Sequence, residues 1–227
     1  MSSRRYILLI VLVSVSYLSM AQPRLRRPEI YIGVHAGALA SMVDFSPTVD
    51  GIRPLNSPIS PNGGLVFRYA GHKVCAIQVE VNYMQRGWRE YIAHTDSIMG
   101  TDYRRKLHYI EVPLLMHLYF GSEHFRGFVN LGPQVGYCFL DDNSSVSSVT
   151  APSAHQYASI QQRFDWGLAG GLGMYYRTRK AGIFQLEARF NYSFGCVFNS
   201  RRTDYFSRSN PMDLSLNLAY MWEIKVK

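Results

Sequence analysis

The fold is decided most clearly by the stretch Leu107–Phe120, which reads LHYIEVPLLMHLYF. Its even-numbered positions are almost wholly apolar, whereas its odd-numbered positions include Tyr109, Glu111 and His117. Successive side chains of a β-strand point to opposite faces, so a period of two residues indicates a strand with one apolar and one polar face. We therefore expect a strand whose two faces meet different surroundings.

Seven further segments of the chain alternate in the same way. They are Glu29–Ser41, Gly63–Ala70, Val74–Gly87, Phe125–Leu140, Phe164–Tyr176, Ile183–Phe194 and Asp213–Val226. The connections between the eight segments alternate in length. The long ones are Met42–Asn62, Trp88–Tyr103, Asp141–Arg163 and Gly195–Met212, and the short ones are Gly71–Lys73, Gly121–His124 and Arg177–Gly182. Long loops at one end and tight turns at the other are typical of outer-membrane barrels.

The composition of the two faces favours a membrane barrel over a soluble β-domain, the alternative that also alternates. The apolar face carries large residues, and the polar face mixes glycines with charges. A narrow closed barrel meets lipid outside and must hold hydrogen-bonded polar groups inside. We therefore predict an all-β fold, an eight-stranded antiparallel transmembrane β-barrel with long extracellular loops, short periplasmic turns and both termini in the periplasm.

The N-terminus is typical of a secretory signal peptide. Arg4 and Arg5 precede an apolar run over Tyr6–Val15, and Ser19–Ala21 supplies small residues for cleavage before Gln22. A membrane anchor is the alternative, but the run is about half the ~20 residues that a spanning helix needs. We predict a cleaved signal peptide over residues 1–21, a basic periplasmic segment over 22–28, and a barrel of the cell outer membrane over 29–227.

The formal net charge of +8 predicts anionic partners. Export excludes nucleic acid, so outer-membrane lipid and lipopolysaccharide are the expected partners. Basic residues expected at the outer rim, as lipopolysaccharide contacts or as a solvated loop face, are Arg104, Arg105, Lys106, Arg201 and Arg202. Those expected in a periplasmic turn, where a partner protein could contact them, are Arg177, Arg179 and Lys180.

Charged residues on the polar faces predict an ionic network inside the barrel. By parity, the network contains Arg68, Glu80, Glu111, Glu187 and Arg189. Unpaired buried charges are costly, so we expect these side chains to pair and fill the lumen, with a proton or ion path as the alternative. A filled lumen passes no protein cargo.

The sequence offers no catalytic, cofactor-binding or metal-binding motif. No Ser, His and acidic residue converge as a hydrolase requires, so we expect neither catalysis nor a cofactor. The cysteines are Cys75, Cys138 and Cys196, with only Cys138 on an inward face, and we expect free thiols.

Two of the motifs resemble strands of the PorT-type outer-membrane barrel family of Bacteroidota. They are Tyr109–Leu115, which reads YIEVPLL, and Leu131–Tyr137, which reads LGPQVGY. Weaker similarities lie in Gly33–Gly37, Asp165–Gly173 and Gln185–Tyr192. The resemblance covers nearly the whole mature chain, although this chain ends in WEIKVK rather than in the aromatic residue common in such barrels.

The resemblance implies a membrane barrel of about eight strands and, for the family's best-known member, a requirement in type IX secretion of proteinases and adhesins. The expected function is therefore that of a non-enzymatic accessory barrel for type IX secretion, in contact with other secretion components. Two alternatives stay open: a structural or adhesive barrel, and a barrel enzyme that modifies lipid A.

Overall fold

The chain forms one closed antiparallel β-barrel. The computed structural model describes residues 24–46, 52–55, 59–92, 101–122, 124–142, 162–178, 181–195 and 208–224. The eight long strands are β1 (Arg24–Ser46), β3 (Ser60–His72), β4 (Cys75–Ile92), β5 (Thr101–Gly121), β6 (Phe125–Asp142), β7 (Phe164–Thr178), β8 (Gly182–Ser193) and β9 (Arg208–Ile224). Residues 1–21, the predicted signal peptide, lie outside the described residues.

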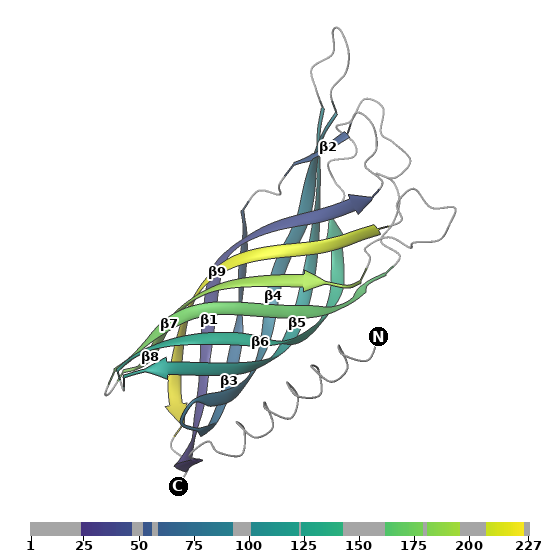
Figure 1. Cartoon of the computed structure of the whole chain (residues 1–227). Helices are drawn as coiled ribbons and strands as arrows, with labels where there is room; N and C mark the ends of the chain where they lie inside the picture. The colour runs from purple at the N-terminus through teal and green to yellow at the C-terminus, as the bar shows by residue number, and fades with distance from the viewer. Residues whose placement is uncertain are drawn as a thin grey trace, which may run out of the picture.

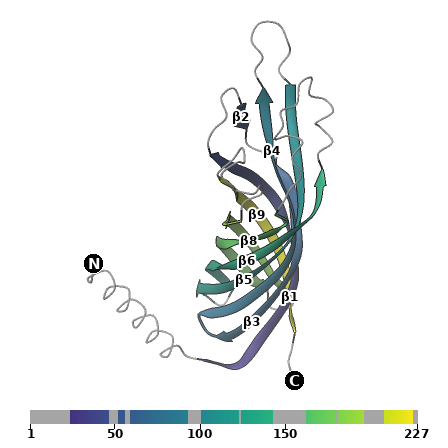
Figure 2. The same cartoon turned by 90° about the vertical axis from the view of Figure 1, so that its right-hand side faces the viewer.

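Strand pairing closes the sheet completely. The order runs β4-β3-β1-β9-β8-β7-β6-β5, and a β4–β5 pairing joins its two ends, as Figures 1 and 2 show. Closure removes the free edges, so the backbone groups along the barrel are paired strand to strand, as a membrane demands. The predicted fold class is confirmed.

Several strands are longer than the alternation predicts. β1 begins at Arg24, within the segment expected to precede the barrel, and β4 and β5 pair as far as Ile92 and Thr101. A short ninth strand, β2 (Ile52–Leu55), adds to the edge of β4 inside a segment predicted as a long loop. Beyond the lipid a strand is no longer required to alternate apolar with polar residues, so the pattern gives no signal there.

The two ends of the barrel differ. The three short turns lie at one end together with the start of β1 and the end of β9 (Figure 1), and we call it the short-turn end. Gly121 and Gly182 border two of these turns with φ angles of 126° and 90°, a region that only glycine enters easily. We call the opposite end the long-loop end.

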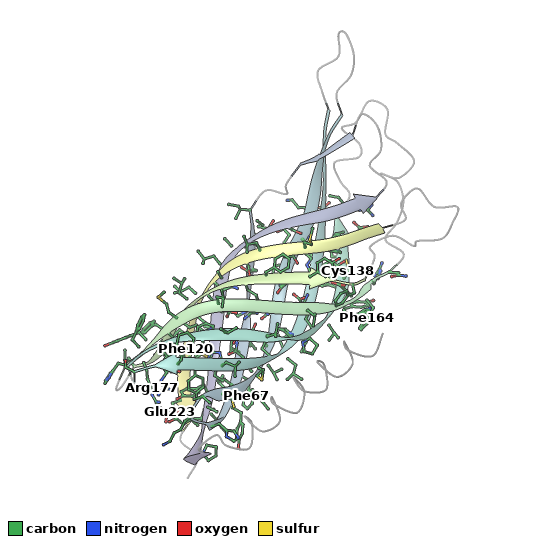
Figure 3. All side chains as sticks on the ribbon, in the orientation of Figure 1. Phe67, Phe120, Cys138, Phe164, Arg177 and Glu223 are labelled. Atoms are coloured by element: carbon green, nitrogen blue, oxygen red, sulfur yellow. The ribbon has the colours of Figure 1, made fainter. Side chains whose placement is uncertain are left out.

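The outward and inward faces are the reverse of those in a soluble protein. On β5, Ile110, Leu114 and Met116 are about half exposed, whereas Glu111 and His117 are buried. The other long strands repeat this pattern, with large apolar side chains outside and polar ones inside (Figure 3). An apolar outer surface of this kind is compatible with lipid. No helix in the described segments is long and apolar enough to cross a membrane.

Candidate functional site

The centre of the lumen holds a group that we call the Arg189 network: Arg68, Glu80, Glu187, Arg189 and the amides bound to them. Arg189 Nη1 and Nη2 lie 2.5 and 2.7 Å from the two carboxylate oxygens of Glu80. Its Nε and Nη2 each lie 2.9 Å from an oxygen of Glu187. One guanidinium thus bridges β4 and β8, which carry these acids on opposite sides of the lumen.

Amide side chains complete the Arg189 network. Glu80 accepts from Gln78 at 2.5 Å and from Asn82 at 2.8 Å. Glu187 accepts from Asn130 at 2.9 Å and from Gln185 at 3.1 Å. Arg68 donates to the side-chain oxygens of the same two glutamines, from Nε to Gln78 at 2.7 Å and from Nη2 to Gln185 at 2.5 Å. Two cations therefore face two carboxylates, and each carboxylate has donors besides Arg189.

A second group, which we call the Arg86 cluster, lies nearer the long-loop end. Arg86 contacts Asp213 at 2.5 Å, Asp165 at 2.9 Å and Glu111 at 3.2 Å. Its guanidinium also lies 4.9 Å from the centroid of the Tyr109 ring, in cation–π geometry. All of these side chains are buried. One cation here faces three carboxylates, so the cluster holds an excess of acidic groups.

The β6 side of the Arg86 cluster carries an unsatisfied amide and a glycine at which a methyl group would fit. Gln134 is buried, and neither polar atom of its side chain has a hydrogen-bond partner within the described residues. Gly136, two positions along, pairs with Glu111 on β5 and with Asp165 on β7. A Cβ built at Gly136 would meet its nearest neighbours at 3.6 Å or more, an ordinary contact distance. The acidic cluster therefore has room beside it.

Aromatic rings plug the lumen near the short-turn end. Tyr119, Phe128 and Tyr175 surround His117, whose ring centroid lies 4.7 Å from that of Phe128. His117 Nδ1 lies 2.7 Å from Asn130 Oδ1, so the plug is hydrogen-bonded to the Arg189 network above it. We call these four residues the aromatic plug.

An ionic clasp crosses the short-turn end below the plug. Arg177 lies 3.2 Å from Glu29 and 2.9 Å from Glu223, and joins β7 to β1 and β9. Figure 3 shows Arg177 and Glu223 close together at this end, with Cys138 near the opposite one. Plug, network and cluster together fill the lumen with buried side chains from above the clasp to the level of Arg86.

The five residues predicted for the interior network are all buried inside the barrel. The structure brings Glu80, Glu187 and Arg189 into direct contact, links Arg68 to them through amides, and places Glu111 in the separate Arg86 cluster. The prediction missed Arg86, Asp165 and Asp213. Their positions share the inward parity of Glu80, Gly167 and Ser215, so the alternation itself could have identified them.

The predicted lipopolysaccharide contacts do not form one surface. Arg105 is buried and bonds to Asp141 at 2.9 and 2.6 Å, so it faces the lumen and not the lipid. The reason is alternation: consecutive residues of one strand cannot all face outward. Lys106 does face outward. The side chain of Arg104, and Arg201 and Arg202, lie outside the described residues.

Only some of the residues predicted for the periplasmic turn and for free thiols lie within the described residues. Arg177 lies in the clasp, while Arg179, Lys180 and Cys196 lie outside the described residues. Cys138 is buried on the inward face, as parity predicted. Within the described part of the chain, no group of three or more His, Cys, Asp or Glu is placed to hold a metal ion.

Comparison with known proteins places this architecture among outer-membrane barrels. The family model described as "Outer membrane protein beta-barrel domain" matches residues 20–199. The outer membrane protein OprG of Pseudomonas aeruginosa is similar in structure, with a TM-score of 0.51 and 13% identity over 86% of this chain and 96% of that one. No curated protein matches the sequence.

Two further solved structures are similar at lower scores. Ail, the attachment invasion locus protein of Yersinia pestis, has a TM-score of 0.42 and 14% identity over 86% of this chain and 99% of that one. Neisserial surface protein A has a TM-score of 0.41 and 14% identity over 84% and 96% of the two chains. At these identities the similarity to OprG supports the fold alone. The TM-scores of the other two structures are too low to support a further conclusion.

Proposed function

Because the chain belongs to the family of outer membrane proteins with this β-barrel domain, we propose that it is a non-enzymatic accessory component required for type IX protein secretion. In this role the barrel spans the outer membrane with its long-loop end outside and its termini in the periplasm. It acts on the export of proteinases and adhesins by contacting other secretion components, and carries no cargo itself.

The observation that carries the accessory role is the filled lumen. Arg68, Arg86 and His117 are each at most 2% exposed although they lie inside the barrel. An eight-stranded barrel is just wide enough for side chains to fill its interior. A protein cannot pass such an interior, so a secretion role must use the ends or the outer wall of the barrel.

The secretion role itself is supported by the two best family-like motifs, which meet in the structure. Tyr109–Leu115 and Leu131–Tyr137 lie on the neighbouring strands β5 and β6, with Glu111 paired to Gly136. Their inward residues surround the Arg86 cluster, whose guanidinium contacts Glu111 and the Tyr109 ring. The motifs thus form one structural unit of the barrel.

The experiment is deletion of the gene followed by assay of culture fluid and periplasm for type IX cargo. We expect unprocessed cargo to accumulate in the periplasm while the outer membrane stays intact, and plasmid-borne wild type to restore export. Normal export in the deletion strain would overturn the secretion role and leave a structural or adhesive barrel. Leakage of unrelated periplasmic proteins in the deletion strain would also contradict it, because the defect would then be one of membrane integrity.

A second measurement tests the accessory part of the proposal separately. Purified barrel in a planar bilayer is expected to show no conductance large enough for an unfolded polypeptide, because the plug and the network fill the lumen. A stable, wide conductance would contradict the accessory role even if export depends on the protein.

A further inference from the structure

The outward face of β5 changes from apolar to polar near the long-loop end. Its apolar positions run from Ile110 to Phe120. Ten residues at about 3.4 Å each, on a strand tilted by roughly 40°, span about 25 Å, the height of the apolar band of an outer-membrane barrel. The next outward residues toward the long-loop end, His108 and Lys106, therefore lie at the level of the lipid headgroups.

His108 is held in an aromatic cluster on this outer surface. The Tyr83 hydroxyl lies 2.7 Å from His108 Nδ1, and the two rings are stacked with centroids 5.9 Å apart. Phe139 of β6 lies on the other side, 6.1 Å from the His108 ring and 6.3 Å from that of Tyr83. A phenol that donates to Nδ1 puts the proton of the neutral ring on Nε2, and a protonated ring carries one there as well. The cluster thus fixes the orientation of the ring, and Nε2 is a donor whenever Nδ1 accepts from the phenol or the ring is protonated.

One basic residue lies next to the aromatic cluster on the outward face. Lys106 lies two residues from His108 on the same face of β5, about 7 Å along the strand. Lys106 is half-buried and lies opposite Asp142 of β6 in the strand register. Lys106 therefore brings an ammonium group to the outward face next to the aromatic cluster.

The described outward side chains of the opposite wall differ from these at the same end. There the described outward residues of β1 and β9 are Ala36, Ala38, Ala40, Leu214 and Leu216. None of them is charged or donates a side-chain hydrogen bond. Among the described outward side chains, the lysine and histidine thus lie on β5, with Tyr83 of β4 and Phe139 of β6 beside them.

We propose that Lys106, His108 and Tyr83 bind a phosphate group of a phosphorylated glycolipid of the outer leaflet, of the lipid A class. Lys106 supplies a point charge and His108 Nε2 a directed donor, and both bind phosphate oxygens well. The apolar residues that follow His108 on β5 contact the acyl chains, and Phe139 sits at the boundary between the two. The site requires the long-loop end to face the outside, as in the proposed function.

The test measures lipid that stays bound to the purified protein. The full mature barrel is extracted from its own outer membrane in mild detergent, and bound phosphorylated glycolipid and phospholipid are quantified by native mass spectrometry. We expect the wild type to retain glycolipid and the double variant K106Q/H108Q to retain roughly tenfold less, as the loss of a charge-assisted contact predicts. Tyr83→Phe, which removes only the hydroxyl that orients His108, is expected to lower retention by a smaller factor.

A matched control lies at the other end of the barrel. Lys73 is exposed in the turn between β3 and β4, and Lys73→Gln is expected to leave glycolipid retention unchanged. Equal loss in this control would mean nonspecific charge binding and would overturn the site, as would unchanged retention in K106Q/H108Q. Preferential retention of phospholipid by the wild type would also overturn it, because it would place this end in the inner leaflet. None of these readouts depends on cargo export, so the two proposals fail separately.

Discussion

The Arg189 network and the Arg86 cluster lie in the same narrow lumen, yet their buried charges are paired in different ways. In the network, two guanidiniums and two carboxylates balance, and four amides supply further donors to the carboxylates. In the cluster, Arg86 alone faces three carboxylates. The network is thus a redundant set of contacts, whereas the cluster depends on a single residue.

The difference indicates where in the lumen a single substitution is expected to change the stability of the barrel most. A buried charge that loses its partner is strongly destabilising, but the cost falls when other donors remain. The network and the aromatic plug below it therefore act as a firm filling. The cluster, with unpartnered Gln134 and the space at Gly136 beside it, is the part of the lumen whose stability a single substitution changes most.

The largest expected effect comes from removing the two arginines in turn. Arg86→Met is expected to lower the free energy of unfolding by about 3–5 kcal/mol, because three buried carboxylates lose their cation. Arg189→Met is expected to cost at least about 1 kcal/mol less, because amide donors remain on Glu80 and Glu187. Urea titration in detergent micelles, followed by tryptophan fluorescence, measures both. Equal losses in the free energy of unfolding would show that the network and the cluster do not differ in their dependence on one arginine.

Neutralising one carboxylate in each group is expected to change stability by different amounts. Glu80→Gln is expected to destabilise the barrel by about 3 kcal/mol, since Arg189 loses a two-oxygen partner. Glu111→Gln is expected to change stability by less than about 1 kcal/mol or to raise it, because Arg86 keeps Asp165 and Asp213 and like charges are relieved. The same urea titration measures both variants. A large loss of stability in Glu111→Gln would show that the cluster needs all three acids.

A glycine pair tests the packing difference. A Cβ at Gly173 would lie 2.4 Å from Phe128 Cζ and 2.3 Å from the Leu186 carbonyl, so Gly173→Ala is expected to cost about 1–3 kcal/mol. Gly136→Ala is expected to change stability by about 0.5 kcal/mol or less, because its Cβ meets only ordinary contacts. The temperature at which each variant loses its compact form on an unboiled gel reports the ranking. The reverse ranking would mean that the plug is the looser region.

The smallest effect is expected at the clasp. The side chains of Arg177, Glu29 and Glu223 are 28%, 26% and 38% exposed. Ion pairs between exposed side chains of this kind contribute about 0–1 kcal/mol to stability. Arg177→Gln should therefore shift the urea midpoint only slightly, and 1 M salt should shift the wild type by a comparable amount. A loss as large as that of Arg86→Met would show that the clasp, and not the lumen filling, holds the short-turn end.

The barrel and its inward charges could be predicted because alternation is a local property. Ile110 and Glu111 differ in face simply because they are adjacent on a strand, so parity alone placed Glu80, Glu187 and Arg189 inside. The ends of the strands could not be predicted in the same way. β2 and the outer parts of β4 and β5 lie where no lipid imposes an apolar face, and Arg105 was assigned to the rim by its basic neighbours and not by its parity.

The sequence by itself determined the number of long strands, their faces and the alternation of long and short connections, because each follows from residue order along one strand or from the distance to the next. Only the tertiary structure decided which charges meet. Arg189 contacts Glu80 across 109 residues of chain, and Arg86 contacts Asp213 across 127. Such contacts depend on the register and closure of all eight strands, which hydrogen bonding sets globally and no local pattern encodes.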